Sequence, residues 1–376
     1  MIKILIDASI VSKGGGVQVA LSLIENIAVD PTFEVICVVN PEIDKQLSLL
    51  TKKKIKHYYI ESIEPIYRKF LQGKRISEIE KKYNPSFVFV VFGPAYWKPN
   101  AKTLQGFALG KMLYEKELNI SIYERILNFI KKKIFQTSQS YLLVETELVK
   151  KKLAANFNYS LNEIYVIGNS YSPKFKKNIL DNEKEVFPLK DKFRILVPGS
   201  YYQHKNLERI ILALSEVKKY PSFSQNLEIV FTIPKESVEW KSLLVLAENN
   251  AVQGLISTAG FVENSKFAEL YLKSHAIICA SLVESSTAVF PETFIAKRPL
   301  LVSDRPFAKE LCEDAALYFN PLDEKDIAHS ILKIVSDVNL QKKLIDNGEK
   351  VLLKNYPSAE QKWALQKKLI IELANK

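Results

Sequence analysis

The chain has 376 residues, of which 47% are hydrophobic and 25% are charged, and its formal net charge is +11. This length and apolar content predict a globular protein with two domains of ordinary size. No apolar run approaches the roughly 18 to 20 residues of a membrane span. Three widely spaced cysteines, Cys37, Cys279 and Cys312, indicate neither a disulfide framework nor a zinc site.

The N-terminal stretch "MIKILIDASIV" has the pattern of a strand, with no charged leader and no small-residue cleavage site. We therefore expect a cytoplasmic protein. The four histidines are scattered along the chain. We expect no metal and no cofactor.

The positive charge is concentrated in the first half of the chain. Residues 1–190 hold 29 Lys and Arg against 19 Asp and Glu, whereas residues 191–376 hold 24 against 23. A basic surface of this kind can meet an anionic membrane, or it can simply be solvated. We expect no nucleic-acid partner, because no nucleic-acid-binding motif accompanies the charge.

Apolar strands alternate with helical stretches in the first half. Strands are expected at 2–7, 33–40, 86–93, 141–146 and 164–170, and helices at 17–28, 76–82 and 148–156. A polar segment at 176–192 is interpreted as a linker. This alternation is typical of a doubly wound parallel sheet.

The alternation restarts after residue 192. Strands are expected at 193–199, 227–234, 255–260, 276–280 and 300–304, with a helix from Asn206 to about Lys219 and a terminal helix at 358–374. The fold class is therefore α/β with two Rossmann-like domains. We expect domains at 1–180 and 181–355, followed by a C-terminal helix at 356–376.

Three glycines, Gly14 to Gly16, come directly before the first expected helix in "SKGGGVQVAL". Glycines at a helix N-terminus let backbone N–H groups approach a phosphate or a sugar. A dinucleotide fingerprint does not fit, because Val19 stands where its third glycine should be. A flexible loop that caps the helix is the other interpretation.

The stretch "VPGSYYQHKNLERI" places Lys205 between an expected strand and an expected helix, with Asn206 as a candidate N-cap. An ammonium group there can hold a diphosphate as a point charge. A lysine that faces solvent beside a helix cap is the alternative.

Two glutamates stand eight positions apart in "SLVESSTAVFPETF", Glu284 at an expected strand end and Glu292 in the first turn of a helix expected to begin near Pro291. Glu292 can accept hydrogen bonds from a ribose diol, and Glu284 from hexose hydroxyls. Ser285, Ser286 and Thr287 offer hydroxyl and N–H groups to phosphate oxygens. The alternatives are an acid that favours the helix dipole and an acid on a surface loop.

Together these stretches, with "RPLLVSDRPFAKELCEDAALYFNPLD", resemble the pattern of glycosyltransferase family 4. The resemblance is strong over most of 190–335, good over the first 30 residues and loose from Asp44 to Ser140. It implies the GT-B fold, in which two Rossmann-like domains face each other and the C-terminal helix crosses back onto the first domain. It also implies transfer of a sugar from a nucleotide-sugar donor with retention of configuration and without a metal.

The resemblance also implies roles for particular residues. Lys205 would hold the donor diphosphate, Glu292 the ribose and Glu284 the transferred sugar. Ser285 to Thr287 would surround the phosphates and the sugar, and Gly15 and Gly16 would approach the donor from the other domain.

The sequence departs from the family pattern at three positions. Ser200 stands where the family often has an arginine of the diphosphate clamp, and Pro291 lies directly before Glu292 instead of three residues earlier. In the segment that aligns with a family histidine near the reacting carbon, Gln105 is the nearest polar residue. His204 or Arg305 could supply the missing positive or donor group.

Two stretches of the first half could contact an acceptor or a membrane. Tyr96 and Trp97, at a strand end in "GPAYWKP", could stack on an acceptor sugar or pack their own loop. The stretch Tyr123 to Phe135 is amphipathic with three lysines, and it could lie on a membrane or pack on its own domain.

The leading hypothesis is a retaining, metal-independent hexosyltransferase that acts on a lipid-linked saccharide acceptor. It would serve the synthesis of a bacterial surface polysaccharide (O-antigen, lipopolysaccharide or capsule). A catalytically silent donor-binding subunit is the second hypothesis, motivated by Ser200 and the absent histidine. A sugar-nucleotide epimerase or hydrolase of the same fold is the third. The sequence does not name the sugar, the nucleobase, the acceptor or the linkage.

Overall fold

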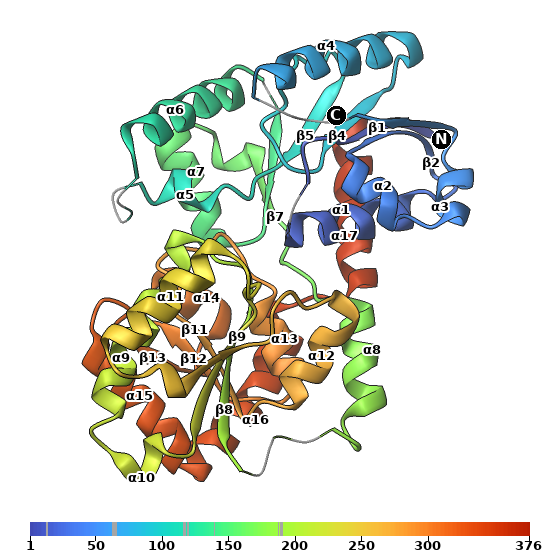
Figure 1. Ribbon diagram of the computed structural model, residues 1–376. Helices are drawn as coiled ribbons and strands as arrows, with labels where there is room; N and C mark the ends of the chain where they lie inside the picture. Colours follow the sequence, from blue (N-terminus) through green and yellow to red (C-terminus); the bar gives the residue numbers. More distant parts are fainter. Residues whose placement is uncertain are drawn as a thin grey trace. The chain divides into compact units, whose positions relative to one another are not determined.

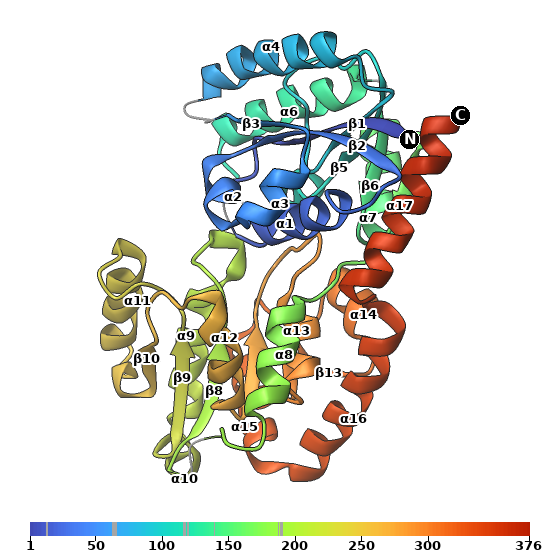
Figure 2. The ribbon, with the colours of Figure 1, turned by 90° about the vertical axis from the view of Figure 1, so that its right-hand side faces the viewer.

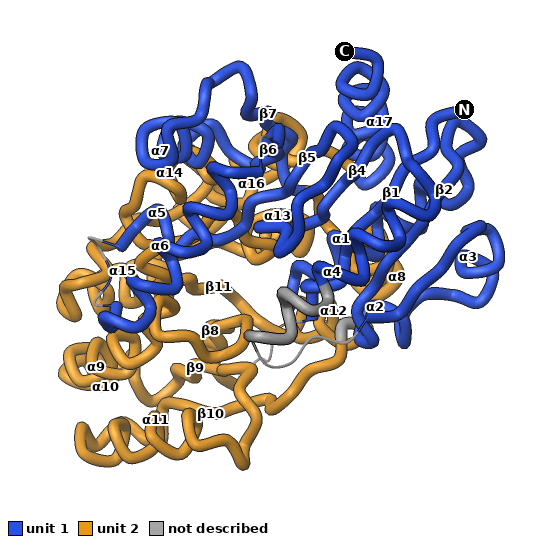
Figure 3. Tube along the Cα trace, turned by 90° about the horizontal axis from the view of Figure 1, so that it is seen from above, with its two compact units in different colours: residues 1–169, 359–376 blue, residues 170–358 orange. Residues whose placement is uncertain are grey.

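The computed structural model describes residues 1–12, 14–61, 66–115, 118, 120–138, 140–186, 188 and 191–376, with the side chains of 66–72 and 264 left aside. The chain forms two compact units, shown in Figure 3. Unit 1 comprises Met1–Asn169 and Ala359–Lys376, and unit 2 comprises Ser170–Ser358. The unit boundaries thus fall at 169/170 and 358/359, whereas the sequence suggested 180/181 and 355/356.

In the described part of unit 1, seven parallel strands form a sheet in the order β3-β2-β1-β4-β5-β6-β7. The strands are β1 (Ile2–Ala8), β2 (Phe33–Val39), β3 (His57–Ile60), β4 (Phe87–Val90), β5 (Lys102–Gly106), β6 (Tyr141–Val144) and β7 (Ile164–Val166). The helices are α1 (Gly15–Ile27), α2 (Pro41–Gln46), α3 (Leu49–Lys54), α4 (Ile66–Tyr83), α5 (Gly110–Leu113), α6 (Ile122–Thr137), α7 (Glu147–Phe157) and α17 (Ala359–Asn375), with a 3₁₀ turn at Leu161–Glu163 (Figure 1).

Both faces of this sheet are buried, as successive residues of β1 show. Ile4 and Ile6 enter the core on one face, together with residues of α1, whereas Leu5 packs on the other face with Ile76 of α4. Side chains alternate across a strand, so a strand covered on both sides must be apolar almost throughout. This is why the runs at 2–7 and 33–40 were readable as strands.

The C-terminal helix α17 belongs to unit 1, as predicted, although it follows unit 2 in the chain. Ile370 and Leu373 are fully buried in the same core as β1 and α1. In its first turn Lys362 Nζ lies 3.1 Å from Glu145 Oε1, and at its middle Lys367 Nζ lies 2.7 Å from Asp30 Oδ2. Figure 2 shows α17 running beside the sheet of unit 1.

In unit 2, the six strands of the described sheet follow the order β10-β9-β8-β11-β12-β13, again all parallel. They are β8 (Phe193–Val197), β9 (Leu227–Phe231), β10 (Ile256–Thr258), β11 (Ala276–Cys279), β12 (Leu300–Ser303) and β13 (Ala316–Phe319). The helices are α8 (Pro173–Asn182), α9 (Leu207–Val217), α10 (Pro221–Ser224), α11 (Val238–Asn249), α12 (Asn264–Leu272), α13 (Val289–Ile295), α14 (Pro306–Cys312), α15 (Glu324–Ser336) and α16 (Val338–Asn355), with 3₁₀ turns at Gln203–Lys205 and Gln253–Leu255.

The interpretation of the segment 176–192 as a linker is wrong for its first part, because helix α8 extends to Asn182. Ser172 caps this helix by accepting a hydrogen bond from Phe175 N, and Pro173 starts it. Phe175 and Ile179 are buried, and the Phe175 ring lies edge-on to Tyr271 at 5.3 Å. Two buried residues four positions apart in a polar segment are too short a period to be recognised from the sequence.

Candidate functional site

Both sheets reverse their strand order at one place, between β1 and β4 in unit 1 and between β8 and β11 in unit 2. In open α/β sheets the loops that leave the carboxyl ends of the strands at such a point form the ligand site. Lys205 lies in the loop that follows β8, and Glu284 lies in the loop that follows β11. The topology of unit 2 therefore brings together two of the residues predicted from the sequence.

The loop after β8 is fixed by backbone contacts at both ends. Gly199 has φ +115°, a conformation that favours glycine. The Thr232 hydroxyl accepts a hydrogen bond from the N–H of Gly199 and donates one to the carbonyl of Gly199. A 3₁₀ turn then brings Lys205 N to within 2.8 Å of the Tyr202 carbonyl. Ser200 is exposed in this loop.

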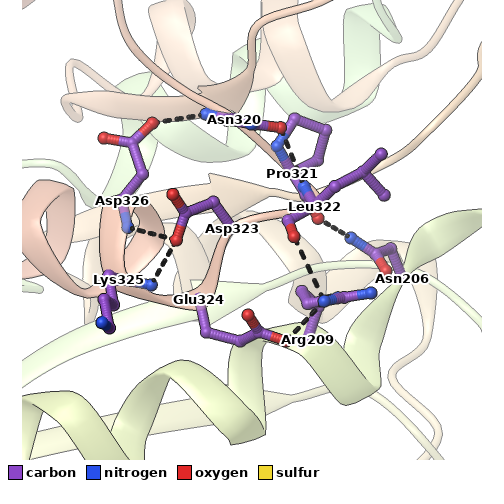
Figure 4. Close-up of polar contacts among 9 residues, drawn as sticks. All are labelled: Asn206, Arg209, Asn320, Pro321, Leu322, Asp323, Glu324, Lys325 and Asp326. Atoms are coloured by element: carbon purple, nitrogen blue, oxygen red, sulfur yellow. Dashed lines mark hydrogen bonds and ion pairs between the residues drawn. The ribbon is translucent and has the colours of Figure 1, made fainter.

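Asn206 does not cap α9 with its side chain, contrary to the sequence-based expectation. It adopts the left-handed conformation with φ 58°, and its Nδ2 donates to the Pro321 carbonyl at 2.8 Å. Figure 4 shows the adjoining contacts, in which Arg209 of α9 binds the Leu322 carbonyl and Glu324. Asn206 thus ties the end of the Lys205 loop to the "NPLD" loop after β13.

The "NPLD" loop is held by its own polar side chains (Figure 4). Asn320 Oδ1 accepts from Leu322 N, and Asp323 Oδ1 accepts from Lys325 N as the N-cap of α15. Asp326 Oδ2 accepts from Asn320 N at 2.6 Å. The motif that carries part of the sequence resemblance is therefore a rigid support for the loop of Lys205.

Lys205 and Glu284 form an ion pair in the ligand-free chain. Lys205 Nζ lies 2.5 Å from Glu284 Oε1, which also accepts a hydrogen bond from Ser281 Oγ at 2.8 Å. Burial by itself lowers the pKa of Lys205. Other interactions raise it by more, the largest being the charge of the neighbouring Glu284 carboxylate, so the pKa of Lys205 lies above its usual range. The ammonium group is therefore fully charged at neutral pH.

A backbone contact joins the same two loops. Leu282 N donates to the His204 carbonyl at 2.7 Å, one residue before Lys205 and two residues before Glu284. Their side chains are only 17% and 10% exposed, respectively. The pair is thus held at a fixed place on the edge of the sheet, where it remains partly open to solvent.

Glu292 lies in α13, which begins at Val289, two residues earlier than expected. Its carboxylate accepts a hydrogen bond from the Tyr271 hydroxyl at 3.2 Å. Burial raises the pKa of Glu292 to about 7, and the Tyr271 hydrogen bond opposes this only in part. A carboxyl group with this pKa can accept hydrogen bonds from hydroxyl donors or exchange its proton near neutral pH.

Three buried polar atoms without hydrogen-bond partners lie at or after the carboxyl ends of β11 and β12, the same edge of the sheet as Lys205 and Glu284. Among the described residues, Ser286 Oγ after β11, Ser303 Oγ at the end of β12 and Arg305 Nε just beyond it are buried without a hydrogen-bond partner. Buried polar atoms are nearly always paired in proteins, so these three groups are available to bond water or a ligand. Thr287 Oγ1 differs, since it accepts from Val289 N at the start of α13.

Gly14 to Gly16 stand at the N-terminus of the 13-residue helix α1. Gly14 occupies the N-cap position with φ 64°, and no side chain caps the helix. A Cβ added to Gly15 would meet nothing within 4 Å, whereas one added to Gly16 would approach Val11 Cγ1 to 3.2 Å. The start of α1 is thus open at Gly15 and tightly packed at Gly16.

The loop that follows β4 holds Tyr96 and Trp97. Trp97 Nε1 donates to the buried carboxylate of Asp7 at 3.0 Å, and its ring packs against the core beneath α4. Burial raises the pKa of Asp7, although hydrogen bonds from Ser9 and Trp97 oppose the effect. These contacts favour the loop-packing interpretation for Trp97, while half-buried Tyr96 lines a small cavity beside Asp7.

Gln105 is fully buried in β5, and its amide group is engaged on both sides. Its Oε1 accepts from Ala95 N at 2.8 Å, and its Nε2 donates to Ser138 and Ser140 at 2.9 and 2.6 Å. The structure therefore favours a structural role for Gln105, which fixes the Tyr96 loop from below. Sequence reasoning missed this role because the partners lie up to 35 residues away.

The remaining histidines with defined contacts are structural. His275 Nδ1 accepts from Arg194 N at 3.0 Å, and His57 stacks on Tyr83 at 4.0 Å. In the described ranges no His, Cys, Asp and Glu residues gather in threes as a metal site would require. Within the same ranges, no helix combines the length and apolar character needed to cross a membrane.

Comparison with known proteins finds similarity to glycosyltransferases in the second half of the chain. Residues 180–351 match the family model described as "Glycosyl transferases group 1". A stretch of 197 residues is 29% identical to the O-antigen chain mannosyltransferase RfbU of Salmonella typhimurium, covering 52% of this chain. The match spans 50% of that relative, or about half its length. The resemblance predicted from the motifs is confirmed.

Solved structures share the fold at low identity. A glycosyltransferase from Rickettsia africae ESF-5 has a TM-score of 0.74 at 19% identity, with 99% of this chain and 98% of that chain covered. Anabaena Alr3699/HepE, solved in complex with UDP-glucose, has a TM-score of 0.75 at 11% identity, with 99% and 100% covered. The predicted GT-B fold class is confirmed.

Proposed function

We propose that this chain, whose residues 180–351 match the family model of group 1 glycosyl transferases, is a retaining, metal-independent glycosyltransferase. It moves a hexose-type sugar from a nucleotide-diphosphate donor to a saccharide acceptor, lipid-linked, in bacterial surface polysaccharide synthesis. The observation that carries the proposal is the Lys205–Glu284 ion pair at the strand-order reversal of unit 2, with Glu292 on the helix that follows.

The donor site assigns one chemical task to each residue. The Lys205 ammonium, held in its charged form, binds the diphosphate and stabilises the negative charge that develops on it as the sugar leaves. Glu284 accepts hydrogen bonds from sugar hydroxyls once its contact with Lys205 is shared with the donor. Glu292 accepts from the ribose diol, and Ser285 to Thr287 provide donors for phosphate oxygens.

The reaction breaks the bond between the anomeric carbon and the diphosphate oxygen, and the electron pair of that bond leaves with the nucleoside diphosphate. The acceptor hydroxyl oxygen bonds to the anomeric carbon from the same face, and its proton passes to an oxygen of the departing diphosphate. Positioning and charge stabilisation supply the rate enhancement, and no enzyme nucleophile is required. The exposed Gly15 leaves the first turn of α1 accessible to a phosphate or a sugar.

The relatives support the substrate classes. An O-antigen mannosyltransferase among them supports a bacterial polysaccharide acceptor, and a neighbour solved with UDP-glucose supports a nucleotide-sugar donor. A lipid-linked acceptor agrees with the basic first half of the chain and with a peripheral position at the inner face of the cytoplasmic membrane.

The test is product analysis with the purified chain and radiolabelled nucleotide-sugars, with and without lipid-linked saccharide acceptors. We expect transfer or slow hydrolysis of one donor, and at least a hundredfold loss in Glu292→Ala, whereas the matched variant Glu236→Ala, at a side chain that is 93% exposed, keeps full activity. Full activity in Glu292→Ala would contradict the assigned site.

A catalytically silent donor-binding subunit is the second candidate. The observations that favour it are the exposed Ser200 at the position of a clamp arginine and the engaged amide of Gln105. Arg305, with an unpaired Nε at the same sheet edge, offers the positive group that Ser200 lacks. Donor binding without turnover by the isolated chain would favour this candidate, and conversion of donor without acceptor would favour an epimerase or hydrolase.

A further inference from the structure

Helix α6 turns an apolar face to solvent. Five large apolar side chains on it are between 43% and 78% exposed: Ile122, Tyr123, Ile126, Phe129 and Ile130. They recur at the three- and four-residue spacing that places side chains on one face of a helix. In the described part of the chain, no other helix exposes as many large apolar residues.

The opposite face of α6 is anchored to unit 1. Phe135 is fully buried, and its ring lies 6.1 Å from Phe157 at the end of α7. Gln136 Nε2 donates to the Phe157 carbonyl at 3.0 Å. In Figure 1, α6 lies next to α5 and α7. The helix is thus packed in place on one side, and its exposed apolar face is not a consequence of fraying.

The helix is also well defined at its start. Ser121 and Glu124 form a capping box, in which Ser121 Oγ accepts from Glu124 N and the Glu124 carboxylate accepts from Ser121 N. Its 16 residues correspond to a length of about 24 Å. A rigid apolar stripe of this length has the form of a docking surface.

The charges of α6 select the partner. Arg125 and Lys131 to Lys133 give the helix four cations against one acid, Glu124. The carboxylate of Glu124 faces Lys111 of α5, with 3.7 Å between Nζ and Oε1. Exposed Lys133 stands over the Phe129 ring at 5.7 Å, so cationic and apolar groups alternate on the outward side. This combination complements an anionic surface with an apolar interior.

We propose that the outward face of α6 docks unit 1 on an anionic lipid surface, with Ile126 and Phe129 inserted among the acyl chains and Arg125 and Lys133 on the headgroups. This inference deepens the proposed function by naming the surface that would bring the enzyme to a lipid-linked acceptor. The docking itself does not require catalysis, so the two can be tested separately.

The experiment is flotation of the full chain with vesicles of phosphatidylcholine alone or mixed with phosphatidylglycerol. We expect binding only to the mixed vesicles, and its loss at high salt, because screening weakens the headgroup contacts. The apolar variant Ile126→Ser/Phe129→Ser should lose binding. The charge variant Arg125→Gln/Lys133→Gln should weaken it about fivefold for each cation removed.

Leu353→Ser is the matched control, since Leu353 is an 86% exposed apolar residue on a helix of unit 2, and it should bind vesicles as the wild type does. The α6 variants change exposed residues, so they should keep the melting temperature and the donor hydrolysis of the wild type. Loss of vesicle binding can therefore be distinguished from loss of the fold or of enzyme activity. Unchanged vesicle binding by Ile126→Ser/Phe129→Ser, or no vesicle binding by the wild type, would overturn the proposal. So would self-association of the wild type that the same variant abolishes.

Discussion

Replacing Glu292 with glutamine tests how the folded chain treats this carboxyl group. Burial raises its pKa from the ordinary 4.5 to about 7. Between these two values the unfolded chain has released the proton while the folded chain still holds it, so the free energy of unfolding falls as the pH rises. Above about pH 7 the buried, ionised carboxylate lowers the free energy of unfolding by its full amount, and below pH 4.5 this loss is absent.

The interval from 4.5 to about 7, at about 1.4 kcal/mol per pH unit, corresponds to roughly 3 kcal/mol of lost stability at pH 8. A glutamine has the same shape, cannot ionise and can still accept from the Tyr271 hydroxyl. We therefore expect Glu292→Gln to gain on the wild type by about 2 kcal/mol between pH 5 and pH 8, measured by urea unfolding at each pH.

The control is Glu236→Gln, whose side chain is 93% exposed and whose effect should not vary in this pH range. A constant difference between Glu292→Gln and the wild type from pH 5 to pH 8 would refute the argument from burial. In the donor-bound state the sign reverses, because a ribose diol donates best to the ionised carboxylate. Donor affinity of the wild type should therefore fall as the pH drops below 7, by up to about tenfold per pH unit.

Three further predictions follow from single contacts. Glu284→Gln should lower the free energy of unfolding by about 3 kcal/mol in urea denaturation, because it leaves Lys205 without its carboxylate, and an unchanged stability would show that the ion pair is not formed in solution. Gly15→Ala should keep the wild-type melting temperature but weaken donor binding in titrations. Gly14→Ala should lower the free energy of unfolding by about 1 kcal/mol, because the φ of Gly14 is 64°. Equal losses of stability and of donor binding in the two variants would exclude a role for Gly15 in binding the donor. Trp97→Phe should cost about 2 kcal/mol in thermal unfolding, since the buried aspartate loses a hydrogen bond, and a neutral effect would mean that water replaces the indole N–H.

Much of the fold was predictable because fully buried parallel strands have an unmistakable apolar pattern. Strand β5 was missed, since Gln105 and Gly106 are poor strand residues by composition. Gln105 is stable there only because Ala95, Ser138 and Ser140 satisfy its amide. Such contacts come from tertiary structure, and no local pattern announces them.

The sequence indicated which residues to consider for the candidate site but not how they are arranged. The positions of Lys205 and Glu284 after their strands placed both at one edge of a sheet, yet their direct ion pair spans 79 residues of sequence. Asn206 looked like a helix cap, and it instead binds a carbonyl 115 residues further along. The raised pKa of Glu292 depends on burial that follows from packing alone.

The most direct test of the donor site is a thermal-shift screen of the purified chain against UDP, GDP, ADP and their sugar conjugates, repeated with Lys205→Ala and Glu292→Ala. A ligand that binds only the folded state raises its melting temperature by mass action. We expect a shift with one nucleotide that both variants abolish. A shift that persists undiminished in both variants, or no shift with any nucleotide, would contradict the assigned donor site.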